Sequence, residues 1–237
     1  IQKSYPDEIN KSKFHLAILK EYFQYKILEI IFNSKWAGNL VFLGGTNLRI
    51  IHNLNRFSED IDFDVTGNYS DASHEELCLT ICNQLEKEGY DVEPDRDRVK
   101  RNPEHTAFTR YINFPGLLKK MGMHDDPNKK FLVKIDAEAH HYGDFSYTPE
   151  VVMINKFDVF TSVKATPASI ILSTKLCSVL ERSKGRDFYD IIALSGKYKV
   201  NEEYLASRFK FGLLKEEYYG PVHLQEKILS AVATIHW

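Results

Sequence analysis

The sequence predicts an α/β (α+β) fold in which a mixed sheet is followed by a mostly helical C-terminal part. Residues 40–43 form an uninterrupted apolar run, which is typical of a buried strand. Acidic and apolar residues alternate strictly over residues 60–65, which is typical of a strand with one polar face. Helical periodicity from Pro167 onward predicts the helical part.

The first part, residues 1–147, begins with a long amphipathic helix. Apolar residues recur there at three- and four-residue steps, so we expect this helix to pack against the sheet. Gly89 is expected to end a later helix, because glycine readily adopts the left-handed conformation found after helix ends. The elements predicted in chain order are a helix over 6–33, a strand over 40–43, a helix over 46–54, a strand over 61–65, a helix over 73–88, and strands over 106–114 and 131–139.

The order of the motifs places the second part at residues 148–237. Pro167 is expected to open a helix there, because a proline in the first helical turn sacrifices no hydrogen bond. Gly185 interrupts the helical pattern, and Asp187 is expected to cap the helix that follows. The predicted elements are a pair of extended segments within 151–163, helices over 167–181 and 187–196, and helical structure over about the last forty residues.

Composition narrows the class of protein. A chain of 237 residues with 43% hydrophobic residues is long enough to form a packed core. The 31 basic and 33 acidic residues are intermixed, so the formal charge of -2 neither requires nor excludes a nucleic-acid partner. Cys78, Cys82 and Cys177 form no Cys-x-x-Cys pair, so we expect buried reduced thiols, as in a cytoplasmic protein.

Several motifs are missing from the sequence. No apolar run approaches the roughly 20 residues of a membrane-spanning helix, so we expect no membrane partner. The Walker A, His-Glu-x-x-His and Gly-x-Ser-x-Gly patterns are also missing, which argues against the enzyme classes that use them.

The most informative segment joins a glycine turn to a strand rich in carboxylates. Gly44 and Gly45 follow the first predicted strand and allow a ligand to approach the backbone closely, and Thr46 can begin a helix. Asp60 and Asp62 lie two residues apart on a strand and therefore share one face, as does Asp64. Because neighbouring carboxylates repel unless a cation lies between them, the pattern predicts a divalent metal ion that carries a nucleotide.

A third carboxylate is predicted in the strand over residues 131–139. Asp136 is an acid inside an apolar strand, which suits a further metal ligand. Glu138 lies two residues later and faces the same way, so the sequence leaves open which of the two serves. A structural salt bridge is the alternative for either residue.

The second part contributes a set of basic residues. Lys175 stands on an apolar helix face, where an ammonium group needs an anion, and either a triphosphate or Asp190 can supply one. Arg182, Lys184 and Arg186 cluster after that helix, either as phosphate contacts or as a solvated loop.

Together these motifs resemble the active-site signature of the DNA polymerase beta-like nucleotidyltransferase superfamily, in which an apolar-Gly-Gly/Ser turn precedes an acid-apolar-acid-apolar strand. Within it, residues 44–49 (Gly-Gly-Thr-Asn-Leu-Arg) and 56–64 (Arg-Phe-Ser-Glu-Asp-Ile-Asp-Phe-Asp) are similar to the AbiEii/AbiGii toxin family, also called the DUF1814 type. Residues 175–177 (Lys-Leu-Cys) and 181–191, which contain Arg-Asp-Phe-Tyr-Asp, are similar to a later motif of that family. The resemblance covers roughly residues 40–194.

The resemblance implies a polymerase beta-like nucleotidyltransferase core whose active-site cleft is completed by the C-terminal part. It implies transfer of a nucleoside monophosphate from an NTP to an acceptor, with Mg²⁺ or Mn²⁺ as cofactor. The expected acceptor is RNA such as tRNA. The expected role is that of the toxin in a toxin–antitoxin or phage-defence abortive-infection system, with a separately encoded antitoxin.

The site residues implied by the motifs and the resemblance fall into three groups. Catalysis is assigned to Asp60, Asp62, Lys175 and Asp190. Metal binding is assigned to Asp60, Asp62 and Asp136. Nucleotide binding is assigned to Gly44, Gly45, Thr46, Ser58, Lys175, Arg182 and Arg186.

Further alternatives remain open from the residues alone. Arg49 and Arg56 flank the glycine motif and either contact phosphate or pair with Glu59. At the level of function, two alternatives are a catalytically silent nucleic-acid- or antitoxin-binding module of the same fold and a small-molecule nucleotidyltransferase of the antibiotic-modifying type.

Overall fold

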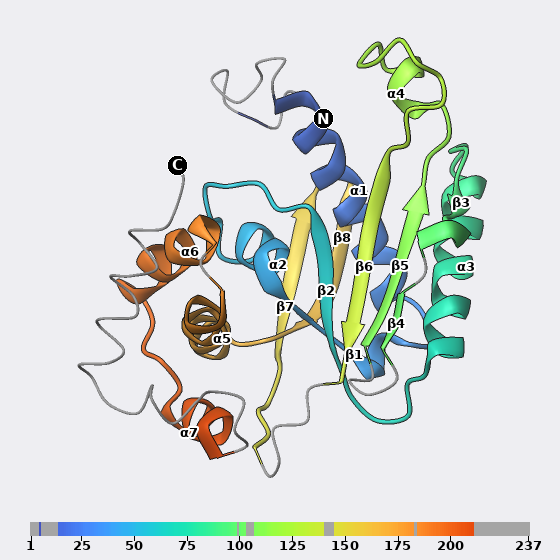
Figure 1. The fold of residues 1–237 in the computed structure, drawn as a ribbon. Coiled ribbons are helices and arrows are strands. Elements are labelled where there is room, and N and C mark those ends of the chain that lie inside the picture. Colours follow the sequence, from blue (N-terminus) through green and yellow to red (C-terminus); the bar gives the residue numbers. More distant parts are fainter. Residues whose placement is uncertain are drawn as a thin grey trace. The chain divides into compact units, whose positions relative to one another are not determined.

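The computed structural model describes residues 5, 14–98, 100–102, 107–139, 145–182 and 184–210 (Figure 1). The chain divides into two compact units. The first unit comprises Ile1–His140 and Val151–Ala165, and the second comprises His141–Glu150 and Thr166–Trp237.

Within the described residues of the first unit, eight strands form one mixed sheet in the order β3-β5-β6-β2-β1-β8-β7, with β4 paired to β5. Strand β2 runs antiparallel to β1 and parallel to β6, which brings two distant parts of the sequence side by side. The strands are β1 (Leu40–Leu43), β2 (Asp60–Val65), β3 (Glu93–Pro94), β4 (Lys100–Asn102), β5 (Ala107–Asn113), β6 (Leu132–Glu138), β7 (Glu150–Lys156) and β8 (Val159–Ala165). The α/β fold with a mixed sheet is therefore as predicted.

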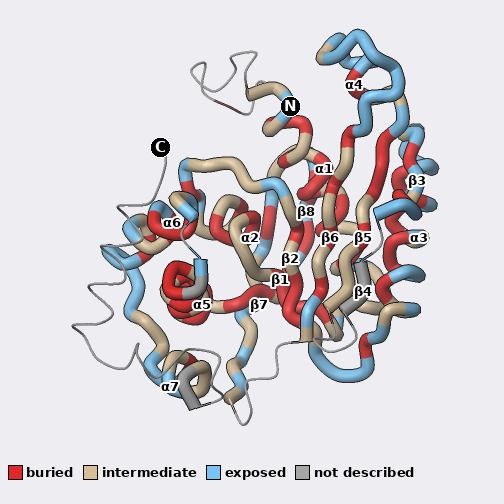
Figure 2. The backbone as a smooth tube through the Cα atoms, viewed as in Figure 1, coloured by how far each residue is buried: buried red, intermediate tan, exposed pale blue. Residues whose placement is uncertain are grey.

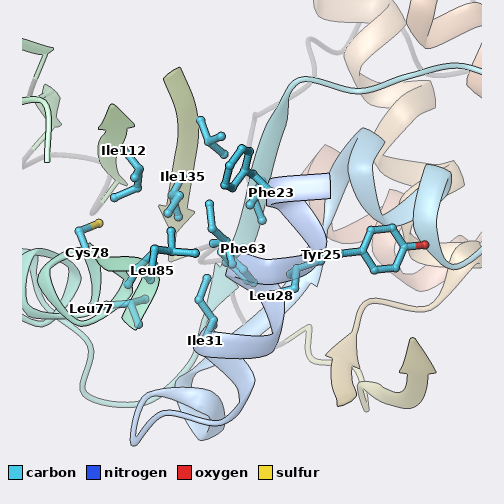
Figure 3. Packing of buried hydrophobic residues seen from close by; sticks show 14 of the residues in the cluster. Phe23, Tyr25, Leu28, Ile31, Phe63, Leu77, Cys78, Leu85, Ile112 and Ile135 are labelled. Carbon is cyan, nitrogen blue, oxygen red and sulfur yellow. The ribbon is translucent and has the colours of Figure 1, made fainter. Parts of the chain in front are cut away.

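Helices α1 and α3 cover one face of this sheet and form the main hydrophobic core with it (Figure 3). Ile61 and Phe63 of β2 and Ile135 of β6 face these helices and are at most 1% exposed. The strands at the centre of the sheet are buried along much of their length, whereas α3 alternates between buried and exposed turns (Figure 2). The helices of this unit are α1 (His15–Phe32), α2 (Gly44–Ile50), α3 (Asp71–Lys87) and α4 (Leu117–Lys120), with short 3-10 turns at Ala37–Asn39 and Arg96–Arg98.

Helix α2 differs from its predicted range of 46–54 at both ends. It begins at Gly44, and its N-cap is Leu43, so the predicted role of Thr46 in starting the helix is wrong. It ends at Ile50 because Asn53 adopts a φ of 54°, which a right-handed helix cannot continue and which asparagine tolerates better than most residues. The Leu54 N–H then turns back to the Leu48 carbonyl oxygen at 3.0 Å.

His74 of α3 is fully buried against β6. Its Nε2 lies 3.3 Å from the Ile135 carbonyl oxygen, and its Nδ1 lies 2.9 Å from the Tyr69 hydroxyl. Because a carbonyl oxygen can only accept, Nε2 carries the proton and Nδ1 accepts from Tyr69. Burial, reinforced by the charge of Arg110, lowers the pKa of His74 to about 4. The imidazole is therefore neutral in the folded protein at pH 7.

Acid is expected to destabilise the fold through His74. The unfolded histidine takes up a proton below about pH 6.5, whereas the folded one does so only near pH 4. The unfolded state thus binds more protons between these values, and stability is lost as the pH falls, by roughly 3 kcal/mol at pH 4. Urea unfolding at pH 7 and pH 4.5 measures the loss. A His74→Gln variant should lose less between the two pH values, and an equal loss in both proteins would contradict the assignment.

In the second unit, the regular elements described after residue 166 are helices. Its helices are α5 (Ala168–Glu181), α6 (Gly185–Ser195) and α7 (Glu202–Lys210), and its core is formed by Ile170, Cys177, Leu180 and Tyr204. Phe145 and Tyr147, which precede β7, pack against that core. None of the helices in the described part of the chain combines the length and apolar character needed to span a bilayer.

Other sequence predictions compare with the structure as follows. Cys78, Cys82 and Cys177 are buried thiols. The predicted extended segments within 151–163 are the strands β7 and β8, and they belong to the sheet. Residues 6–13 of the predicted first helix and the segment after residue 210 lie outside the described residues.

Candidate active site

The carboxylates predicted on β2 share one face of the sheet with side chains of β6. In the parallel pairing of these strands, Asp60 is opposite Lys134 and Asp62 is opposite Asp136. Asp64 and Glu138 form the next pair along the strands. Residues opposite one another on adjacent strands point to the same side of a sheet, so all six side chains share one side. We call the side carrying Asp60, Asp62, Asp64, Lys134, Asp136 and Glu138 the acid face.

Asp136 is the acid of β6 that lies directly beside Asp62. The Thr109 hydroxyl of β5 donates to Asp136 Oδ1 at 2.6 Å, so the carboxylate is held from one side. Glu138 is exposed and lies one step further along the strand, opposite Asp64. Asp136 is therefore the one of the two acids that lies beside Asp62, and its role as the third carboxylate of the site stays a prediction.

Lys134 is a residue of the acid face that the motif search did not single out. Its Nζ donates to Asp136 Oδ2 and lies 3.7 Å from Asp60 Oδ2. Burial disfavours its charged form, but the hydrogen bond to Asp136 and the charges of Asp136, Asp60 and Asp62 outweigh burial and raise the pKa of Lys134. The ammonium group is thus a cation bound between two of the predicted metal ligands. The alternation that placed Asp136 on this face also places Lys134 there, two residues earlier.

The glycine turn lies against the acid face. Gly44 adopts a φ of 82°, and a Cβ at this position would lie 2.1 Å from Asp62 Oδ2. A Cβ at Gly45 would lie 2.8 Å from Ser58 Oγ and 2.9 Å from Arg56 Nη2. Both glycines therefore make room for functional groups: a carboxylate at Gly44, and a hydroxyl and a guanidinium at Gly45.

Thr46 links the turn to β2. It is fully buried, and its hydroxyl donates to the backbone carbonyl oxygen of Asp60. This bond fixes the start of β2 relative to α2. The contact predicted between Thr46 and the nucleotide stays a prediction.

The basic and acidic residues that flank the motif have partners that the sequence did not indicate. Arg49 Nε lies 2.7 Å from Glu21 Oε2, and Arg49 Nη1 donates to the Leu54 carbonyl oxygen at 2.9 Å. Glu59 pairs with Lys20 at 3.5 Å. Arg49 therefore ties α2 to α1, and it pairs with Glu21 in place of Glu59, which was one of the two alternatives that the sequence left open.

The acid face supplies carboxylate oxygens, which are the ligands that Mg²⁺ and Mn²⁺ prefer, and it holds them on a sheet. Three of them, from Asp60, Asp62 and Asp136, are brought to neighbouring positions. Across the residues that the structure describes, no three His, Cys, Asp or Glu side chains are already arranged to hold a metal ion. At the acid face, the Lys134 ammonium contacts oxygens that a metal ion would use. The residue types fit a metal ion, and the assignment of these acids as ligands stays a prediction.

A second group of predicted residues lies in the helical unit. Lys175 Nζ lies 2.9 Å from Asp187 Oδ1 and 2.9 Å from Asp190 Oδ2, and Arg182 Nε lies 3.2 Å from Asp187 Oδ2. Both carboxylates are 0% exposed. We call Lys175, Arg182, Asp187 and Asp190 the Lys175 cluster. Asp190 is one of the two anions that the sequence allowed as a partner of Lys175, and the structure shows this ion pair.

Asp187 has a different role from the one predicted. The N-cap of α6 is Lys184, and no side chain caps the helix. Burial opposes the charged form of Asp187, but Lys175 and Arg182 outweigh burial and hold the pKa of its carboxyl below the ordinary value. The predicted capping role is therefore wrong, because the carboxylate serves as the partner of two cations. Lys184 and Arg186 are exposed, and the nucleotide contacts predicted for Arg182 and Arg186 stay predictions.

A model of a known protein family matches most of this chain. The family is described as "Nucleotidyl transferase AbiEii toxin, Type IV TA system", and the match covers residues 26–228. The chain belongs to this family. The family predicted from the motifs, a family of nucleotidyltransferase toxins of type IV toxin–antitoxin systems, is therefore confirmed.

Solved structures of nucleotidyltransferases share the fold of this AbiEii protein. One is MenT4, a nucleotidyltransferase toxin from Mycobacterium tuberculosis H37Rv, with a TM-score of 0.56 at 17% identity, over 83% of this chain and 64% of that chain. Another is a putative nucleotidyltransferase from H. pylori, with a TM-score of 0.52 at 16% identity, over 94% of this chain and 99% of that chain. The chain thus spans less than two thirds of the length of MenT4. No curated protein sequence matches it.

Proposed function

We propose that this AbiEii protein transfers a nucleoside monophosphate from an NTP to an RNA acceptor such as tRNA, using Mg²⁺ or Mn²⁺ at the acid face. The observation that carries the proposal is the placement of Asp62 beside Asp136 on adjacent strands, with Gly44 leaving room for the Asp62 carboxylate. Two rigid strands that present carboxylates at neighbouring positions are the scaffold that phosphoryl transfer by metal ions requires.

In this mechanism Asp60, Asp62 and Asp136 are the residues that would hold the metal ion. When bound, the ion neutralises charge on the transferring phosphoryl group. The Thr109 hydroxyl donates to Asp136 Oδ1 and so keeps this carboxylate in place. The Arg56 guanidinium and the Ser58 hydroxyl, which lie over Gly45, supply positive charge and a hydrogen bond to the phosphates. These residues position the triphosphate for in-line attack by an acceptor hydroxyl.

The biological setting of the proposal comes from the family. A type IV toxin has an antitoxin, which we propose is encoded separately. Modification of an RNA needed for translation would arrest growth, including the growth of a phage-infected cell. Buried thiols such as Cys78 and Cys82 are compatible with the reducing cytoplasm in which this RNA is found.

Labelled-nucleotide transfer tests the proposal. The full chain is incubated with total RNA, Mg²⁺ and each α-labelled NTP in turn, and RNA labelling is expected with at least one NTP. The transfer rate of an Asp60→Ala variant is expected to be lower by about 1,000-fold or more, because a metal ligand lowers the activation barrier by several kcal/mol. It should stay folded, because the Asp60 side chain is 35% exposed.

Asp91→Ala provides the matched control. Asp91 is a surface acid paired with Lys120, with a side chain that is 66% exposed. This variant is expected to retain full activity. Labelling of an aminoglycoside in place of RNA would indicate a small-molecule enzyme, and lack of transfer to either acceptor would indicate a catalytically silent module. Equal activity of the Asp60→Ala variant and the parent would refute the metal assignment.

A further inference from the structure

Lys134 occupies an unusual position for a lysine on a sheet. Its Nζ contacts Asp60 of β2 and Asp136 of its own strand at the same time, so one ammonium group bridges two strands. The bridged oxygens are Asp60 Oδ2 and Asp136 Oδ2. An ammonium is a compact point charge with three donors, so it can bind several carboxylates much as a small metal ion does.

A divalent cation held by Asp60 and Asp136 needs the oxygens that Lys134 contacts. The cation and the ammonium repel each other, and both cannot bind the same oxygen atoms at close range. Metal binding therefore requires that Lys134 move away. The side chain of Lys134 is 27% exposed and has a flexible four-carbon stem, which allows such a movement.

The Asp136 carboxylate stays oriented when Lys134 moves away. Asp136 Oδ1 accepts a hydrogen bond of 2.6 Å from Thr109, and this bond does not involve the lysine. The acid face is thus built so that the cation on Asp136 Oδ2 can be exchanged while the carboxylate keeps its place.

We propose that Lys134 is a resident counter-ion of the acid face, which holds Asp60 and Asp136 together before metal binds and is displaced by the metal ion. This inference rests on the proposed function, because it assumes that the acid face is the metal site. Lys134 then lowers the affinity for metal alone.

Calorimetric titration of the full chain with Mn²⁺, in the absence of nucleotide, tests this role. A Lys134→Met variant keeps the apolar stem and removes the charge, so it is expected to bind Mn²⁺ about tenfold more tightly, because a charge-assisted hydrogen bond no longer competes. A Lys134→Arg variant retains the charge and should bind Mn²⁺ no more tightly than the parent. Equal or weaker Mn²⁺ binding by Lys134→Met would overturn the inference.

Lys130→Met is the matched control for the loss of one positive charge. Lys130 pairs with Asp95 at 3.0 Å, outside the acid face, and its replacement should leave Mn²⁺ affinity unchanged. Thermal unfolding gives a second readout. Lys134→Met should be less stable than the parent without metal and should recover stability when Mn²⁺ is added, whereas a loss that Mn²⁺ does not reverse would indicate a purely structural lysine.

An Asp62→Asn variant separates this inference from the proposed function. If the parent binds Mn²⁺ and Asp62→Asn does not, the metal site is established, and the Lys134 variants alone decide the counter-ion role. If the parent shows no Mn²⁺ binding that depends on Asp62, the metal assignment fails and the counter-ion role fails with it.

Discussion

Replacement of Gly44 by alanine is expected to destabilise the protein by roughly 3 kcal/mol and to reduce nucleotidyl transfer by about 100-fold or more. A non-glycine residue at a φ of 82° costs about 1–2 kcal/mol. The new Cβ would also lie 2.1 Å from Asp62 Oδ2, so the carboxylate must move, and such overpacking costs a further 1–3 kcal/mol, roughly. A displacement of about 1 Å in a catalytic group is enough for a loss of about 100-fold.

Gly122→Ala is the control for the backbone conformation alone. Gly122 has a φ of 65°, and a Cβ there would meet nothing within 4 Å. This variant should lose about 1–2 kcal/mol and keep its activity. Urea unfolding and the RNA-labelling assay measure both quantities. If Gly44→Ala matched Gly122→Ala in both stability and activity, the contact with Asp62 would have no effect on either.

Replacement of Lys175 by methionine is expected to destabilise the helical unit by about 3–5 kcal/mol. Lys175 is the cation between Asp187 and Asp190, which are both 0% exposed, and its loss removes an ion-pair partner from two buried carboxylates at once. Arg182 still contacts Asp187, but it is 46% exposed and compensates only in part. Urea unfolding of the single variant measures the loss, and a Lys175→Met protein as stable as the parent would contradict this account.

A triple variant separates the structural role of the cluster from the predicted catalytic one. Lys175→Met combined with Asp187→Asn and Asp190→Asn removes all three buried charges, so most of the stability should return. Such a protein should remain inactive if Lys175 and Asp190 act in catalysis as predicted. Full transfer activity in the folded triple variant would restrict these residues to a structural role.

The parts of the fold that could be predicted from the sequence are those specified by local patterns. Strand β2 was recognised because its acids alternate with Ile61 and Phe63, and burial of that apolar side is itself the reason the strand forms. The run at residues 40–43 similarly identified β1. Both patterns lie within single elements and need no knowledge of partners.

Features that depend on residues far apart in the sequence are harder to predict from the sequence. Thr109 was not predicted as a site residue, because its contact with Asp136 depends on the antiparallel register of β5 and β6. Asp187 stands in the first turn of a helix, where the local signal for a capping residue is the same as the signal for a buried ion pair. One of its two cationic partners, Lys175, lies 12 residues earlier on another helix.

The measurement that tests the central claim most directly is a crystal structure of the full chain with Mn²⁺ and a non-hydrolysable NTP, in which anomalous scattering locates the metal. The account predicts a manganese ion bound directly by oxygens of both Asp60 and Asp62, with the triphosphate beside Gly44 and Gly45. It also predicts that Lys134 Nζ has left Asp136. A metal–nucleotide complex bound elsewhere, with Lys134 still between Asp60 and Asp136, would contradict it.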